Sequence, residues 1–185
     1  MKYSVDTYEM VFPKYAKLQL KINKAGNLII GASPSLTQGQ LPPGVQGGRV
    51  PKGTKVFNYE DQILVSFTFA DCLNIVNFAK SKMLTSTVDI FRNSTKFNKK
   101  VSFVFAPKDD KPLEAKFATI YFSSTVAEKK EIKFKLPISL VNLDELAQLV
   151  ESYINSYQMI KLYCLSNAQE EEPTHTTEFA SLAEE

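Results

Sequence analysis

The chain has 185 residues, of which 44% are hydrophobic and 23% are charged, and its formal net charge at pH 7 is +2. This is the composition of an ordinary globular protein, and the length is too short for two full-sized domains. The uncharged stretch at residues 28–48 contains three prolines and five glycines, which excludes a membrane span there.

The first half of the chain predicts strands followed by a short helix. The clearest strand is residues 15–23, where apolar and polar side chains alternate as in a half-buried strand with a cationic outer face. Thr68 and Asp71 are both candidate caps for the helix. Strands are predicted at residues 15–23, 28–35, 55–59 and 62–68, and the helix at residues 69–80.

A Gly/Pro-rich loop is predicted at residues 37–54, between the second and third of these strands. Such a stretch cannot pack as a central strand. Arg49, Lys52 and Lys55 give it positive charge. The loop either folds over a ligand or is a tolerated insertion.

The second half repeats the scheme, with strands predicted at residues 86–92, 99–106, 115–123 and 131–136. Pro137 is expected to end the last strand, and Ser139 or Asn142 to cap a long helix whose apolar stripe continues to Tyr163. The predicted fold class is therefore α+β, with two antiparallel, roughly four-stranded sheets each followed by a helix. We expect one domain over residues 1–167.

Charge is distributed unevenly along the chain. Residues 168–185 contain six acids and no Lys or Arg, which leaves residues 1–167 with a net charge of +8. The polar, proline-broken tail is expected to be disordered. A basic body with an acidic tail indicates a polyanionic partner, although a lysine-rich surface without a ligand fits the composition equally well. Twenty of the 22 bases are lysines, which favour contacts to a nucleic-acid backbone over reading of base edges.

Several other functions are disfavoured by the sequence. The first ten residues lack the apolar core of a signal peptide. Cys72 and Cys164 lie in apolar stretches, which predicts free thiols in a reducing compartment: the cytoplasm, including a nucleoid, or the host cytoplasm for a viral protein. A single His, and the lack of a Walker-type phosphate loop or a Ser-His pair, predict no enzyme active site, no metal and no cofactor.

From residue 97 onward the order of motifs resembles the Whirly family of single-stranded-DNA-binding proteins, in the same superfamily as transcriptional positive cofactor four. A lysine-led strand (KKVSFVFA) and an acidic turn precede an aromatic strand (KFATIYFSS), and a strand ending in Leu-Pro-Ile-Ser leads directly into the last helix. The resemblance covers residues 14–163, without a tryptophan and with a longer loop at residues 37–54. It implies two roughly perpendicular sheets held by a helical core, a homotetramer, and strand edges that grip single-stranded DNA.

Candidate nucleic-acid-binding residues are those where cations and aromatic rings interleave, because lysines track the phosphates while rings stack on bases. They are Tyr15, Lys17, Lys21, Lys55, Phe57, Tyr59, Phe91, Arg92, Lys96, Phe97, Lys99 and Lys100. Lys133 and Lys135 share the outer face of their strand. The remaining strand aromatics are expected in the core, as in most sheets: Phe103, Phe105, Phe117, Tyr121, Phe122 and Phe134.

The long helix and the tail suggest partners. The apolar stripe of the helix is wider than one small sheet can cover. This predicts a homo-oligomer, most simply a tetramer, through Leu146, Val150, Tyr153, Ile154 and Tyr157. Phe179 and Leu182 are apolar residues in an acidic tail, and either dock replication or recombination proteins or have no partner.

The predicted function is sequence-independent binding and protection of single-stranded DNA in replication, recombination or repair. The alternative is a transcription cofactor or regulator that binds melted DNA or RNA. An enzyme is the least favoured interpretation. A turn accounts for the paired acids Asp109 and Asp110, and a helix start accounts for Asp144 and Glu145.

Overall fold

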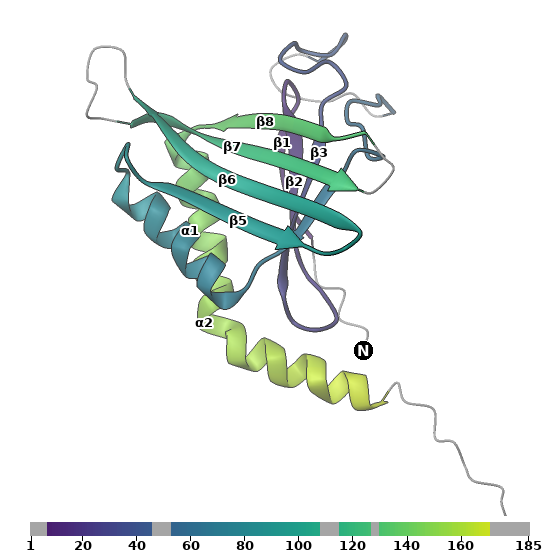
Figure 1. Cartoon of the computed structure of the whole chain (residues 1–185), viewed down its shortest axis with the longest axis vertical. Coiled ribbons are helices and arrows are strands. Elements are labelled where there is room, and N and C mark those ends of the chain that lie inside the picture. Colours follow the sequence, from purple (N-terminus) through teal and green to yellow (C-terminus); the bar gives the residue numbers. More distant parts are fainter. Residues whose placement is uncertain (1–6, 46–52, 108–114, 127–129, 171–185) are drawn as a thin grey trace, which may run out of the picture.

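Two antiparallel four-stranded sheets and two helices make up the fold (Figure 1). The structure is a computed structural model that describes residues 7–45, 53–107, 115–126 and 130–170. The first sheet holds, in spatial order, β1 (Tyr8–Phe12), β2 (Ala16–Ile22), β3 (Leu28–Pro34) and β4 (Ile63–Ser66), and α1 (Phe69–Ser81) follows it. The second sheet holds β5 (Thr87–Asn93), β6 (Phe97–Pro107), β7 (Ala115–Val126) and β8 (Ile132–Ile138), and α2 (Leu140–Glu170) follows it. The predicted α+β class and element order are confirmed.

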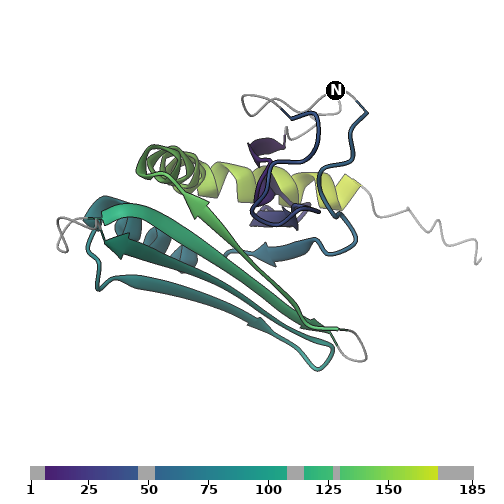
Figure 2. The ribbon, with the colours of Figure 1, turned by 90° about the horizontal axis from the view of Figure 1, so that it is seen from above.

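The two sheets cross at a steep angle. In Figure 1 the strands β5–β8 run across the view, and β1–β3 run behind them from top to bottom. Figure 2, seen from above, places both helices and the first sheet on the same side of the β5–β8 sheet. The opposite face of the β5–β8 sheet is covered by no helix or strand of the described chain, and we call it the outer face.

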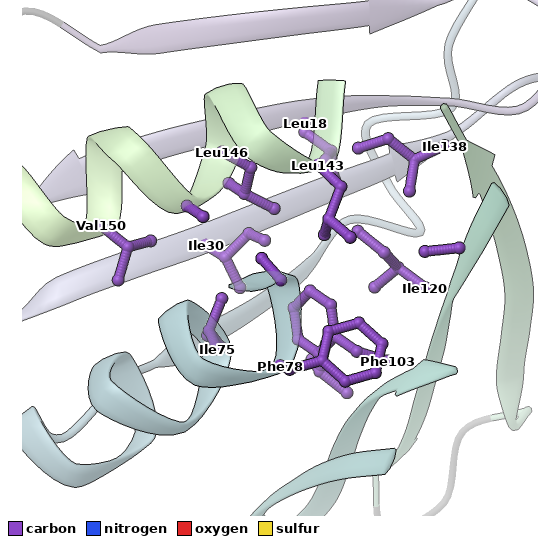
Figure 3. Close-up of a cluster of buried hydrophobic side chains, with 14 of the residues drawn as sticks. Leu18, Ile30, Ile75, Phe78, Phe103, Ile120, Ile138, Leu143, Leu146 and Val150 are labelled. Atoms are coloured by element: carbon purple, nitrogen blue, oxygen red, sulfur yellow. The ribbon is translucent and has the colours of Figure 1, made fainter. Parts of the chain in front are cut away.

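One hydrophobic core joins both sheets to both helices (Figure 3). Phe78 of α1 stacks on Phe105 of β6 with 4.1 Å between the ring centroids, and it also contacts the ring of Phe103. Leu143 and Val150 of α2 are fully buried against the same cluster. Because each such side chain contributes about 1.5–3 kcal/mol on burial, the two helices hold the sheets at their crossing angle.

The first sheet differs from the prediction in two strands. β1 was not predicted, because Val11 is apolar yet 46% exposed and hides the alternation around the buried Met10. Residues 55–59, predicted as a strand, form only an isolated bridge between Phe57 and Ser35. The other predicted strands are present with small shifts at their ends.

The helix starts resolve the alternatives that the sequence left open. Thr68 caps α1 in a capping box with Asp71. At the start of α2 it is Ser139, not Asn142, whose side chain accepts a hydrogen bond from a helix amide, the Asn142 N–H at 3.2 Å. Pro137 does not end β8 but lies within it, which is tolerated because β8 is an edge strand.

Three of the five residues predicted for oligomerisation lie in the core of the single chain. Leu146, Val150 and Tyr153 are at most 5% exposed, and the Tyr153 hydroxyl donates to the Gly26 carbonyl at 2.8 Å. Ile154 and Tyr157 are partly buried against the same core. Assigning the buried three to an interface was therefore wrong: the wide stripe of α2 covers two sheets and α1 instead of one small sheet.

Apart from Val141 in the first turn, the exposed apolar side chains of α2 lie in its later turns. Met159, Leu162 and Leu165 are 73%, 63% and 63% exposed. Within the described chain, neither α1 nor α2 offers an apolar stretch long enough to cross a membrane.

Candidate nucleic-acid interface

Strand register brings cations and aromatic rings together on the outer face of the β5–β8 sheet. Successive side chains of a strand alternate between faces, so Val101 and Phe103 fill the core while Lys100 and Ser102 point outward. Antiparallel pairing places Phe91 opposite Lys100, Lys100 opposite Ser123, and Ser123 opposite Lys133. In the next row, Ser102 lies opposite Tyr121 and Tyr121 opposite Lys135. We call Lys100, Lys133, Lys135, Phe91 and Tyr121 the outer-face cluster.

A groove of about 610 Å³ lies on this face. Lys100, Lys133, Lys135 and Tyr121 all line it, together with small polar side chains from β5, β6 and β7. The rings of Phe91 and Tyr121 are 52% and 46% exposed, so a planar group can reach them. The groove thus offers cations from two strands and accessible aromatic surface, the two ingredients of a site for single strands.

Asp89 places one negative charge within the same groove. Its carboxylate lies 3.1 Å from the Lys100 Nζ, which also lies 4.9 Å from the centre of the Phe91 ring. The hydrogen bond from the Ser102 hydroxyl and the charge of Lys100 hold the pKa of Asp89 below its usual range, against a smaller opposing effect of desolvation. Asp89 is therefore ionised at neutral pH, and it pairs with Lys100.

Lys133 also has an acidic neighbour. Its Nζ lies 2.8 Å from a carboxylate oxygen of Glu131, but its side chain remains 66% exposed. A pair this exposed is weak, so an incoming phosphate can replace the carboxylate as the partner of Lys133.

The predicted cluster on β2 lies on the outward side of the first sheet. Lys17 is 2.7 Å from a Glu9 carboxylate oxygen, its side chain is only 15% exposed, and its Nζ lies 5.8 Å from the centre of the Tyr59 ring. Lys17 is thus already neutralised within the fold, whereas Lys21 is exposed. Tyr15 is partly buried against the core.

The predicted cluster next to the Gly/Pro-rich loop is only partly exposed. Lys55 and Tyr59 are exposed, but Phe57 is 5% exposed and packs with Val45 and Val56 in a small separate cluster. Phe57 is therefore a packing residue, and the prediction that it contacts bases was wrong. Residues 46–52 of the loop lie outside the described residues.

The predicted cluster at β5 and β6 divides between two faces, because side-chain direction reverses at every residue of a strand. Phe91 and Lys100 lie on the outer face. Lys99 points the other way, where its Nζ donates to the Leu64 carbonyl of β4 at 3.0 Å and lies 4.9 Å from the centre of the half-buried Phe97 ring. Lys96 is exposed in the turn between the strands.

Arg92 joins β5 to the start of α1. Its guanidinium donates to the Ser66 carbonyl at 2.7 Å and to the carboxylate of Asp71, with which it forms an ion pair. Asp71 in turn accepts from the backbone N–H of Thr68 at 2.7 Å. Arg92 therefore has a structural role, which a reading of charge along the sequence could not separate from DNA binding.

Replacing this carboxyl (Asp71→Asn) is expected to lower the free energy of unfolding by about 1–3 kcal/mol at pH 7, because it removes the negative charge to which Arg92 and the Thr68 N–H donate. Desolvation raises the pKa of Asp71, but the hydrogen bonds from Thr68 and Arg92 outweigh it and the net pKa is lowered. A lowered pKa in the folded state means that this stabilisation is present above the unfolded-state pKa and is lost as pH falls through the folded value.

Urea titrations of both proteins between pH 7 and pH 2.5 measure this. The difference in unfolding free energy between wild type and Asp71→Asn should shrink at the acid end. A difference that stayed constant over the whole range would mean that the charge of Asp71 contributes nothing to stability.

Tyr121 is the residue of the outer-face cluster that the sequence prediction assigned elsewhere, whereas Lys133 and Lys135 were expected on the outer face of their strand but were not among the twelve candidates. Tyr121 was expected in the core, where Phe103, Phe105 and Phe122 do lie, but it is exposed. The alternation in β7 assigns Tyr121 to the face opposite Phe122, and this was the available signal. Which cations lie beside it depends on the register of β6, β7 and β8, which no local pattern specifies.

The remaining predictions concern the two cysteines, a metal site and the tail. Cys72 is buried and Cys164 is partly buried, both are free, and burial raises the pKa of the Cys72 thiol to about 12. Within the described ranges no three His, Cys, Asp or Glu side chains gather closely enough to hold a metal ion. Phe179 and Leu182 lie outside the described residues.

Comparison with solved structures shows the fold. The chain is similar to WHY1 from Arabidopsis thaliana, with a TM-score of 0.60 and 11% identity over 92% of this chain and 93% of that chain. It is also similar to WHY3 from Arabidopsis thaliana, with a TM-score of 0.59 and 10% identity over 92% of this chain and 98% of that chain.

A third solved structure is that of the plant transcriptional regulator PBF-2, with a TM-score of 0.59 and 10% identity over 94% of this chain and 91% of that chain. No protein-family model matches the sequence, and no curated protein matches it either. These three structures are Whirly proteins, and the chain has the Whirly fold.

Proposed function

We propose that the protein binds single-stranded nucleic acid on the outer face of the β5–β8 sheet, with little dependence on sequence. The observation that carries this is the outer-face cluster, in which three lysines and the exposed ring of Tyr121 line one groove and the exposed ring of Phe91 lies beside Lys100. The resemblance of the sequence to single-stranded-DNA-binding proteins supports it. In the cell, the role we propose is protection of single strands during replication, recombination or repair in the cytoplasm.

The chemistry of the cluster favours single strands over duplexes. A lysine ammonium is a point charge that can follow phosphates without reading bases. Each base stacked on an aromatic ring contributes about 1–3 kcal/mol, and every base has a ring face to offer. A duplex hides those faces within its own base stack, so it would retain only the charge contacts.

Fluorescence anisotropy with single-stranded DNA, duplex DNA and RNA of equal length tests the proposal. We expect tightest binding to single strands and similar affinity for mixed sequences. The logarithm of the affinity should fall with the logarithm of salt concentration by about 0.7 for each phosphate neutralised. Equal affinity for the duplex, or strong preference for one short sequence, would contradict the proposal.

A transcription cofactor or regulator acting on melted DNA or RNA is the second candidate. The observation in its favour is the description of PBF-2, which shares the fold, as a transcriptional regulator. Specific binding to duplex promoter fragments would favour this candidate over a general binder of single strands. Hydrolysis of nucleic acid or nucleotide by the purified chain would contradict both, since each is a binding function.

We also propose a homotetramer, through the exposed apolar side chains of the later turns of α2. Burial of Met159, Leu162 and Leu165 between chains would remove apolar surface from water that the single chain leaves exposed. Light scattering should then give a mass of about four chains, and Met159→Glu/Leu165→Glu should lower this mass without unfolding the protein.

Val141→Glu/Gln148→Glu is the matched control, because both side chains are exposed on the same helix but lie in its first three turns, away from Met159 and Leu165. It should leave the assembly intact. A wild-type chain that is monomeric at micromolar concentration would rule the tetramer out.

A further inference from the structure

A second groove lies between α1 and the free edge of β5. Its volume is about 490 Å³, and its lining includes Asn74, Asn77 and Ser81 of α1 and Ser86 immediately before β5. β5 is an edge strand that pairs only with β6. Thr87 and Asp89 line both this groove and the one on the outer face. The two grooves therefore meet at β5.

The second groove differs from the first in chemistry. Amides and hydroxyls supply donors and acceptors there, and none of its lining residues is a Lys or Arg. Asn74 and Asn77 are three residues apart on one side of α1, and both are exposed. Asparagine is a weaker helix former than alanine, and neither amide makes a hydrogen bond to another described residue that would offset this. These amides are available to an outside ligand.

We propose that a single strand bound to the outer face continues over the edge of β5 into this second groove, where Asn74 and Asn77 contact base edges and sugars. This inference rests on the proposed function, since it extends the path of the same ligand. Asparagine can form two hydrogen bonds to an adenine edge and single ones to other bases, so adenine-rich strands should gain most.

Asp89 determines which part of the strand crosses β5. Its carboxylate lies where the two grooves meet, and Lys100 lies 3.1 Å away on the outer-face side. A phosphate directly over Asp89 would be repelled, whereas base amino groups can donate to a carboxylate. The strand therefore crosses with bases or sugars towards Asp89, and its phosphates remain near the lysines.

The double variant Asn74→Ala/Asn77→Ala tests the path. Alanine favours the helix, so α1 should remain folded. Asn155→Ala/Gln158→Ala is the matched control, because it removes two exposed amides three residues apart on α2, outside either groove. Affinities are measured by anisotropy over a range of salt concentrations, with adenine-rich strands of two lengths. One has about 20 nucleotides, more than the about 4–16 that such sites hold, and the other has about six.

The expected result is about a tenfold loss of affinity for the long strand, from two lost hydrogen-bonding groups, with little change for the short strand. The loss should be the same at every salt concentration, because amides neutralise no phosphate. The control should bind as wild type does.

Two results would overturn the path: wild-type affinity of the groove variant for long strands, or an equal loss for the short strand. Failure of the proposed function looks different, because wild type itself would then not bind single strands. If lysine variants lose binding and Asn74→Ala/Asn77→Ala does not, the strand does not enter the second groove. The outer-face site would then still be supported.

Discussion

Lys133→Glu/Lys135→Glu is expected to weaken binding to single-stranded DNA by at least about tenfold at low salt, and to lower the salt slope by about 1.4, from two phosphates no longer neutralised. Both side chains are exposed on β8, an edge strand, so the substitutions should not disturb the core. Anisotropy titrations from low to moderate salt measure both quantities, and circular dichroism checks the fold.

The matched control is Lys21→Glu/Lys55→Glu, which changes the net charge by the same amount. Lys21 lies on β2 and Lys55 follows the Gly/Pro-rich loop, and both are exposed. If binding depends on the outer face, this control should lose only the smaller, non-local share of the attraction. A larger loss in the control than in Lys133→Glu/Lys135→Glu would move the site to the first sheet.

The fold could be predicted from the sequence to the extent that local patterns determined it. The alternation of residues 15–23 reflects a strand with one buried face, and β2 is that strand. The apolar residues of α2 recur at helical spacing for the same reason, since Leu143, Leu146 and Val150 line one buried side. β1 was missed because five residues with an exposed valine carry too little periodicity to be recognised.

The site was less predictable, because it depends on which strands are neighbours. Lys99 and Lys100 are adjacent in sequence and chemically identical, yet one contacts β4 and the other lies on the outer face. The sequence around Arg92 favours DNA binding, but in the fold its guanidinium pairs with Asp71. Tyr121 joins Lys135 only through the pairing of β7 with β8. Cross-strand register is a long-range property, and local sequence does not encode it in readable form.

In α2 the local pattern was recognised, but the surface that the helix packs against was misassigned. An apolar stripe shows that a helix face is buried, not what buries it. Here the crossing of the two sheets supplies the cover for Leu146 and Val150, so a second chain is not needed at those positions. Only the side chains left exposed after folding, such as Met159, carry information about assembly.

Deleting residues 168–185 is expected to raise the affinity for single-stranded DNA several-fold at low salt. The deletion removes six acids and changes the net charge from +2 to +8. A tethered acidic segment competes for a cationic surface at an effective concentration in the millimolar range for a short flexible tether. The gain should shrink as salt rises, because exposed charges are screened beyond about 8 Å at physiological ionic strength.

A full-length variant with all six tail glutamates replaced by glutamine separates charge from the rest of the tail. If the acids compete with phosphates for Lys100, Lys133 and Lys135, this variant should gain as much affinity as the deletion does. A gain confined to the deletion would assign the competition to the uncharged part of the tail, including Phe179 and Leu182. No gain in either protein would mean that the tail does not occupy the DNA site, and a role for Phe179 and Leu182 in docking replication or recombination proteins would then need support from a direct binding measurement.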